Sequence, residues 1–249
     1  MTILIVGGTG ATGQSLVAEL LQRGEKVKVI ARMGSQLPAK IKNHKNLTVI
    51  RATLLDLSDE ELKQNVKGCK AVASCLGHRL SFKGIYGHPR RLVTDATRRL
   101  CQAIESNRPE KPVKFVLMNT TGNRNQDLNE KISLVENVVV GLIRLLLPPH
   151  VDNEQAAEFL RTQIGKTNKY VNWVIVRPDG LTDEEAVTPY NIVPSPTRSA
   201  IFNAGKTSRR NVAHFMAELI MNELAWAEWK GQMPVIYNEG YVTAPVYGK

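Results

Sequence analysis

The sequence predicts a doubly wound α/β fold, in which helices cover both faces of a mainly parallel sheet, with a small C-terminal lobe. Short hydrophobic runs rich in Val and Ile alternate with helical patterns along the chain, as expected for strands that are buried on both faces. A glycine-rich segment also separates the first strand from the first helix. The 249 residues fit a single domain, residues 1–249, with its own core.

Seven runs have the length and composition of strands. They are Thr2–Val6, Val27–Ala31, Leu47–Arg51, Ala71–Cys75, Val113–Met118, Trp173–Val176 and Met233–Tyr237. Helical patterns lie between them, at Gln14–Arg23, from Ser58 onward, and at Arg91–Ser106, Gln155–Ile164 and Val212–Glu228. Ser58 and Glu61 have the spacing of a capping box, which favours a helix start. This alternation predicts right-handed crossovers between parallel strands.

Two segments do not fit the alternation. Residues 178–210 are rich in Pro, Gly and Ser, and a segment of this length is usually a functional lid or a substrate lobe; a surface excursion is the alternative. Residues 132–147 are strongly apolar and end at two prolines, and they are too short to span a bilayer. We expect a helix that is buried or that contacts a second copy or a protein partner, with a membrane-surface helix as the minor alternative.

Composition narrows the classes of ligand and compartment. Thirty-three Lys and Arg against 23 Asp and Glu give a net charge of +10, which favours anionic ligands. The basic residues are dispersed, so no nucleic-acid binding is expected. Cys69, Cys75 and Cys101 form no CxxC pair and no cluster with zinc spacing, so no metal site is expected. An odd cysteine count without a signal peptide is typical of a reducing compartment, and we expect a cytoplasmic protein that does not enter the membrane.

The glycine-rich segment carries the most specific motif. Gly7, Gly10 and Gly13 have the spacing GxxGxxG between strand and helix, a variant of the dinucleotide-binding fingerprint. Glycines let the chain turn tightly and bring backbone N–H groups against a pyrophosphate at the positive end of a helix. Strand, loop and helix occur in the required order, so a dinucleotide site is predicted, with a purely structural turn as the alternative. The predicted contacts are Gly7, Thr9, Gly10, Ala11, Thr12 and Gly13.

The ends of the second and third strands indicate which dinucleotide binds. NAD sites usually carry Asp or Glu after the second strand, whereas this chain has Arg32. A guanidinium can grip the 2′-phosphate of NADP, and Ser35 could add a hydroxyl donor. The cofactor predicted is therefore NADP, with a solvated Arg32 as the alternative. Asp56 could accept the adenine amino group beside Leu57, or cap the following helix, and the two roles can coexist.

These motifs together resemble the atypical short-chain dehydrogenase/reductase superfamily, in the branch of NmrA-like and flavin reductase/biliverdin reductase B-like proteins. The matching segments are GGTGATG at Gly7–Gly13, VIAR ending at Arg32, LDL at Leu55–Leu57, VIVRP ending at Pro178, and Asn211–Phe215. The resemblance covers most of the chain and implies a Rossmann fold. It also implies further contacts with the ribose and nicotinamide, from Leu76, Gly77, Asn119 and Pro178.

One departure from this family concerns the catalytic pair. Short-chain dehydrogenases usually carry Tyr-xxx-Lys on a helix, and none of the six tyrosines has a lysine four residues later. On the expected helix the chain reads HVDNE over residues 150–154. The resemblance places Thr120 and Thr121 where relatives carry a catalytic or substrate-binding hydroxyl. Among the histidines we favour His78 as proton donor, because imidazole titrates near neutrality; His88 and His150 are weaker candidates, and a structural histidine is the alternative.

The predicted function is that of an NADPH-dependent oxidoreductase without the usual Tyr-xxx-Lys pair. It would transfer a hydride to a small planar acceptor of quinone, flavin or carbonyl type. The first alternative is a non-catalytic, NmrA-like protein that senses NADPH and contacts another protein through residues 132–147. The second is an epimerase or dehydratase acting on a nucleotide sugar, against which the missing pair and the modest C-terminal lobe count.

Overall fold

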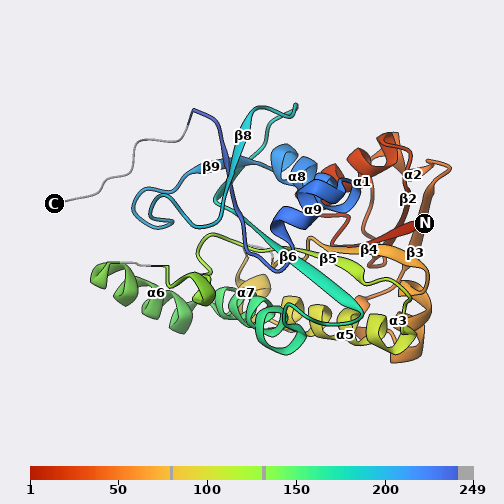
Figure 1. The fold of residues 1–249 in the computed structure, drawn as a ribbon, viewed down its shortest axis with the longest axis horizontal. Helices are drawn as coiled ribbons and strands as arrows, with labels where there is room; N and C mark the ends of the chain where they lie inside the picture. Colours follow the sequence, from red (N-terminus) through yellow and green to blue (C-terminus); the bar gives the residue numbers. More distant parts are fainter. Residues whose placement is uncertain (79–80, 131–132, 241–249) are drawn as a thin grey trace.

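The structure, a computed structural model, describes residues 1–78, 81–130 and 133–240. Its centre is a sheet with the strand order β3-β2-β1-β4-β5-β6-β10-β8 (Figure 1). The strands are β1 Thr2–Val6, β2 Lys26–Ala31, β3 Leu47–Arg51, β4 Cys69–Ser74, β5 Val113–Met118, β6 Val171–Pro178, β8 Tyr190–Val193 and β10 Val235–Asn238. Neighbouring strands from β3 to β10 are parallel, and β8 is antiparallel to β10. The predicted doubly wound α/β fold is confirmed.

Helices cover both faces of this sheet (Figure 1). One layer holds α1 (Ala11–Gln22), α8 (Arg209–Met221) and α9 (Glu223–Trp229), and the other holds α3 (Asp59–Val66), α5 (Leu92–Asn107) and α7 (Pro148–Glu158). Strand β1 shows why both faces are apolar. Ile3 and Ile5 pack into the first layer and Leu4 and Val6 into the second, and all four are buried, because successive side chains of a strand point to opposite faces.

Local signals explain most helix starts. The predicted capping box is confirmed at α3, where the Ser58 hydroxyl accepts from the Glu61 N–H and the Glu61 carboxylate accepts from the Ser58 N–H. Helix α7 begins at Pro148, earlier than the predicted Gln155, because proline lacks an N–H that the first helical turn does not use. Its continuation, Phe159–Ile164, is a π-helix.

The predicted helix Val212–Glu228 is wrong in one respect, since it is two helices. Asn222 has an extended backbone between α8 and α9, and its side-chain oxygen accepts from the N–H groups of Leu224 and Ala225. This is the cap that starts α9, because asparagine satisfies first-turn donors that would otherwise lack partners. The shorter elements are α2 Ala39–Lys42, a 3₁₀ turn at Leu54–Asp56, α4 Phe82–Tyr86 and a 3₁₀ turn at Gln126–Leu128.

Residues 178–210 form a small lobe built on short strands. Strand β8 joins the main sheet, and β7 (Gly180–Thr182) pairs with β9 (Lys206–Ser208) in a separate two-stranded sheet. The connecting loop, residues 194–204, faces the segment that follows β5 across a cavity. The segment therefore has more regular structure than its composition indicates, and its use as a lid or substrate lobe stays a prediction.

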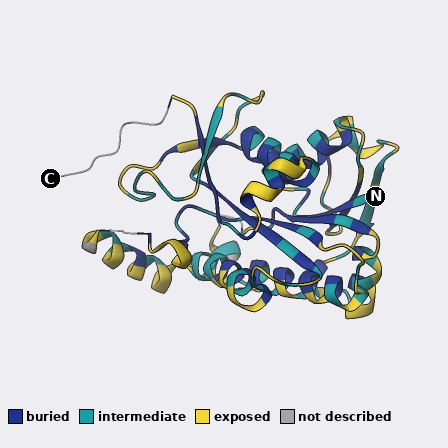
Figure 2. Cartoon of the chain, viewed as in Figure 1, coloured by how far each residue is buried: buried dark blue, intermediate teal, exposed yellow. Residues whose placement is uncertain are grey.

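Helix α6 (Leu134–Leu146) extends beyond the other helices of its side, and most of it is exposed (Figure 2). Ile132, where the predicted apolar segment begins, lies outside the described residues. The expectation of a buried helix is wrong for one face, on which Val135, Val138, Leu142 and Leu145 are 53–79% exposed. Among the described residues, no helix has the length and apolarity that crossing a membrane requires.

Candidate functional site

The glycine-rich loop packs so tightly that its glycines cannot carry side chains. Gly7 has a φ of +73°, and a Cβ there would lie 2.5 Å from the carbonyl carbon and oxygen of Cys75. A Cβ on Gly13 would lie 2.1 Å from the Gly7 oxygen. The loop is thereby pressed against the end of β4 and the start of α1. Such a backbone cradle fits a pyrophosphate, which needs close approach to main-chain N–H groups.

The N-terminus of α1 completes this cradle. Gly10 is the N-cap and offers no side-chain hydrogen bond to the helix, so the first-turn N–H groups of Ala11 and Thr12 have no partner within the helix. The Gly10 N–H itself donates to the Gly7 oxygen at 3.0 Å. The helix dipole adds partial positive charge at this end, which favours a phosphate. The residues present therefore fit a dinucleotide.

Two arginines, Arg32 and Arg51, lie at the adjoining edge of the sheet. Arg32 follows β2 and is exposed, and Arg51 ends β3 opposite Ala31 in the strand register. The Arg51 guanidinium donates to the Ser35 carbonyl at 2.5 Å, and the Ser35 hydroxyl donates to the Arg32 carbonyl at 2.6 Å. The Ser35 hydroxyl thus closes the turn of Arg32 in this structure, and its contact with a phosphate stays a prediction. Arg51 was not among the predicted contacts, although it ends the predicted strand Leu47–Arg51.

The segment after β3 holds the predicted adenine contacts. Asp56 ends the 3₁₀ turn and is exposed, and Leu57 is partly buried. Arg99 fixes this segment from α5 by donating to the carbonyl oxygens of Leu55, at 2.8 Å, and Leu57. The alternative that Asp56 caps the next helix is wrong, because Ser58 caps α3. The role of Asp56 and Leu57 at an adenine ring stays a prediction.

Beyond β4, His78 has partners on both ring nitrogens. Nε2 lies 2.7 Å from an oxygen of Asp152, and Nδ1 lies 3.2 Å from the Gly84 carbonyl. Asp152, which is also buried, accepts from the N–H groups of Val93 and Thr94 at the start of α5. Both partners of His78 are oxygen acceptors, so each ring nitrogen faces a group that can only accept a hydrogen bond. These contacts tie the segment after β4 to α5 and α7, and the use of His78 as proton donor stays a prediction.

The cofactor contacts that the resemblance implies lie at the carboxyl ends of β4, β5 and β6. Leu76 is partly buried and Gly77 is exposed. The Asn119 side chain donates to the Asn153 carbonyl at 2.9 Å and accepts from the Thr120 N–H at 2.9 Å, which fixes the turn after β5 against α7. The Pro178 carbonyl accepts from the Thr121 N–H at 3.1 Å. The contacts of these residues with a cofactor stay predictions.

Thr120 and Thr121 line a cavity of about 1000 Å³ between this turn, α6 and the lobe. Its apolar lining includes Val140 and Ile143 of α6 and two prolines of the lobe, Pro194 and Pro196. Asp179 also lines it and accepts from the Thr121 hydroxyl and from the N–H groups of Gly180 and Gly205. Burial raises the pKa of Asp179 even though these donors oppose the shift. A cavity of this size and lining is typical of a small-molecule site.

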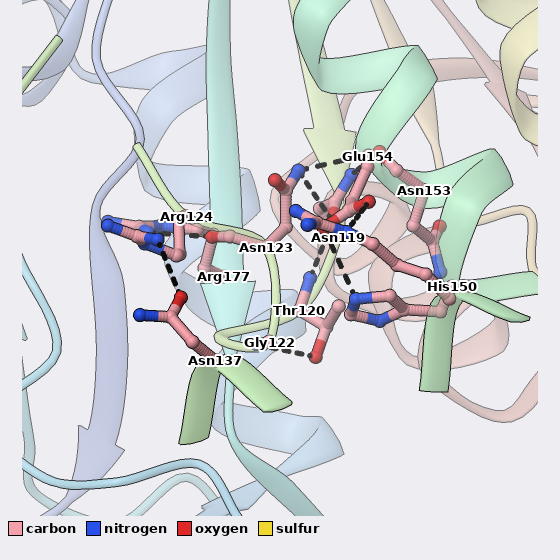
Figure 3. Close-up of polar contacts among 11 residues, drawn as sticks. Asn119, Thr120, Gly122, Asn123, Arg124, Asn137, His150, Asn153, Glu154 and Arg177 are labelled. Carbon is pink, nitrogen blue, oxygen red and sulfur yellow. Dashed lines mark hydrogen bonds and ion pairs between the residues drawn. The ribbon is translucent and has the colours of Figure 1, made fainter. Parts of the chain in front are cut away.

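His150 of α7 lines the same cavity beside Thr120 and Gly122 (Figure 3). Its Nε2 lies 3.3 Å from Glu154 Oε1. The Arg144 guanidinium donates hydrogen bonds to the same carboxylate from two of its nitrogens, at 2.8–3.1 Å. Burial opposes ionisation of Glu154, but the His150 ring and the Arg144 guanidinium outweigh it and lower the pKa of Glu154 to about 2. Sequence reasoning ranked His150 below His78, because the sequence does not show which histidine borders the cavity.

A buried ion pair, Arg177 and Glu130, holds the walls of the cavity together. The guanidinium donates to both Glu130 oxygens at 2.7 and 2.9 Å, and to the carbonyl oxygens of Met233, Asn123 and Pro194 at 2.7–3.1 Å. Its five N–H groups thus all have acceptors. The pair joins β6, the turn after β5, the approach to β10 and the lobe, so it sets the distance between the two sides of the cavity.

A parallel sheet whose strand order turns at β1 and β4, with a glycine cradle before α1, defines a Rossmann-type dinucleotide-binding protein. The chain belongs to the NAD(P)H-binding family, whose model matches residues 7–223. The resemblance to the atypical short-chain dehydrogenase/reductase superfamily agrees with this match, and the structural neighbours share the fold that it implies.

Relatives by sequence and by structure are similar over most of the chain. An uncharacterized chloroplastic protein of Arabidopsis thaliana is 26% identical over 221 residues, which are 89% of this chain and 72% of that protein. The oxidoreductase ylbE of Lactococcus lactis has a TM-score of 0.67 at 21% identity, with 96% of this chain and 91% of the other covered. A short-chain dehydrogenase/reductase of Veillonella parvula, solved in complex with NADP, has a TM-score of 0.68 at 18% identity, covering 96% and 95%. These structures share the fold.

Proposed function

We propose that the protein is an NADPH-dependent oxidoreductase that delivers a hydride to a small planar acceptor of quinone, flavin or carbonyl type. The observation that carries the proposal is the position of the cavity relative to the glycine cradle. In this fold a dinucleotide lies across the carboxyl ends of the strands, with its two halves on either side of the switch between β1 and β4. The adenine half then lies toward β2 and β3, and the nicotinamide half toward β5, where the cavity begins.

Arg32 and Arg51 support NADP over NAD. Both residues lie at the sheet edge where the adenine ribose would bind, and no acidic residue directly follows β2. A charge-assisted hydrogen bond to a phosphate contributes about 1.5–3 kcal/mol, which corresponds to a roughly 10- to 150-fold preference in affinity. NADP complexed with the similar Veillonella parvula structure agrees with this choice.

When bound, the nicotinamide supplies a hydride. The chain's own residues bind and orient the acceptor beside it. The apolar walls formed by Val140 and Ile143 exclude water from a planar ring. The hydroxyl of Thr120 can hold a polar atom of the acceptor at the end of β5, whereas the Thr121 hydroxyl is held by Asp179.

The proposal is tested by following NADPH oxidation with a panel of quinones, flavins and aldehydes. Wild-type protein should oxidise NADPH above background with at least one class of acceptor. When NADPH is the reductant, the Arg32→Glu variant should turn over more slowly than the wild type. His214→Gln, on α8 away from the cavity, is the matched control and should keep the wild-type rate. Tight NADPH binding without oxidation across the panel would overturn the proposal.

The exposed face of α6 favours a second function, an NADPH-sensing binding protein. Val135, Val138, Leu142 and Leu145 are spaced three, four and three residues apart and all are exposed, the spacing with which helices pair. The Tyr86 hydroxyl donates to the Leu146 carbonyl at 2.9 Å, so α4 adds to this surface. A second copy or a protein partner could cover it. A light-scattering mass equal to one chain, with and without NADPH, would exclude the second copy.

A further inference from the structure

We propose that His150, held by Glu154, is the proton donor of this reductase and takes the place of the missing tyrosine. The inference rests on the proposed function, and it concerns one side chain of the cavity. His150 and Glu154 are four residues apart on α7, so both lie on one face of that helix. They have the spacing of the Tyr-xxx-Lys pair, with an acid first and a charged partner one turn later.

One edge of the His150 ring faces the negative charge of Glu154. His150 Nε2 lies 3.3 Å from Glu154 Oε1, and Arg144 of α6 holds the same carboxylate with its Nε and one terminal nitrogen. Nε2 is buried and lies at ion-pair distance from the carboxylate without forming a hydrogen bond in this structure, and the negative charge beside it favours a hydrogen on Nε2. Glu154 is ionised at neutral pH and stabilises the positive charge that the ring carries when it is doubly protonated.

The other edge of the ring faces the cavity. A Cβ built on Gly122 would lie 3.3 Å from His150 Cε1 and 3.7 Å from Nδ1, and the same point is 3.7 Å from the Thr120 hydroxyl. Figure 3 shows the ring and Thr120 side by side beneath Glu154. Nδ1 is therefore the nitrogen that can reach a bound acceptor, with Thr120 beside it. His78 differs, since both of its nitrogens are engaged by Asp152 and Gly84.

For a carbonyl acceptor, the atoms balance as follows. The hydride forms the new C–H bond, the π electrons of C=O move to oxygen, and that oxygen takes the proton from His150 Nδ1. The ring becomes neutral, with its remaining hydrogen on Nε2 toward Glu154, and it regains a proton from water. A flavin differs, because hydride addition at N5 leaves an anion that is stable in water and needs no proton from the protein.

This difference gives a test that separates a proton donor from a structural residue. In His150→Gln, the kcat for an aldehyde or ketone should fall about 100-fold or more, with KM changed less than about threefold. The kcat for free flavin should change less than about threefold, and the dissociation constant of NADPH should stay at the wild-type value. Glu154→Gln should lower the carbonyl-to-flavin rate ratio in the same direction. The matched control is His214→Gln, which should leave the ratio unchanged.

The cofactor-free protein gives an independent readout. The ring nitrogen resonances of His150 should show a hydrogen on Nε2 in the wild type, and the Glu154→Gln variant should lose that preference. Three outcomes would each overturn this inference while leaving the proposed function intact. They are an equal loss of the carbonyl and flavin rates in His150→Gln, a retained carbonyl rate in that variant, and a wild-type His150 whose Nε2 carries no hydrogen. If wild-type protein reduces no acceptor, the proposed function fails and this inference fails with it.

Discussion

Replacing Glu130 by Gln should destabilise the protein strongly, because it leaves a fully buried charge without its counter-ion. The Arg177 side chain is 0% exposed and the Glu130 side chain 6%. In the variant, the amide NH2 group replaces one carboxylate oxygen, so one Arg177 N–H faces another donor. The remaining oxygen is shared with the Asn125 N–H, which donates to the Glu130 carboxylate at 2.7 Å. Removing one partner of a buried ion pair costs about 3–5 kcal/mol.

Urea unfolding measures this cost directly. With a denaturant slope of about 3 kcal/mol per molar, the midpoint of Glu130→Gln should fall by about 1–1.7 M. Glu158→Gln is the matched control, since Glu158 is 51% exposed in its pair with Arg161, and loss of such a surface pair costs about 1 kcal/mol or less. If both variants lose the same small amount, the ion pair does not hold the cavity walls together as described.

Three further predictions concern the cradle, the acid pair and α6. Gly13→Ala should weaken NADPH binding about 5- to 150-fold in fluorescence titrations, because relieving a 2.1 Å contact with the Gly7 oxygen costs about 1–3 kcal/mol. Gly141→Ala is the control: its Cβ meets nothing within 4 Å, and the variant should bind NADPH with the wild-type affinity. Folding lowers the pKa of Glu154 from 4.5 to about 2. Ionised Glu154 therefore stabilises the folded state above pH 4.5, and this contribution is lost as the pH falls toward 2. Unfolding free energies of wild type and Glu154→Gln should therefore converge by up to about 3 kcal/mol over that interval, and parallel curves would refute the pairing. If α6 pairs with a second copy, Leu142→Glu with Leu145→Glu should reduce the mass seen by light scattering to that of one chain, and an unchanged higher mass would place the contact elsewhere.

Much of the fold could be predicted because its determinants are local. A strand buried on both faces shows as a continuous hydrophobic run, and β1, β3 and β5 have the predicted bounds. The Ser58 capping box lies within four residues and was found. The break at Asn222 was missed because the hydrophobic pattern continues through it, and only the extended backbone shows that its side chain is a cap.

The candidate site divides in the same way. The glycine cradle could be predicted because the order of strand, loop and helix places it. The partners of the histidines could not, because they depend on tertiary contacts: Asp152 is 74 residues from His78, and Thr120 is thirty positions from His150 along the chain. The Arg177–Glu130 pair spans 47 residues. A side chain's role at this site is therefore fixed by which elements pack together, which local patterns do not show.

The central claim, an NADPH site formed by the glycine cradle with Arg32 and Arg51, is tested most directly by parallel calorimetric titrations with NADPH and NADH. Wild-type protein should bind NADPH roughly 10- to 150-fold more tightly than NADH, and Arg32→Glu should remove most of that preference while retaining NADH binding. Equal affinities of the wild type for the two cofactors would contradict the account.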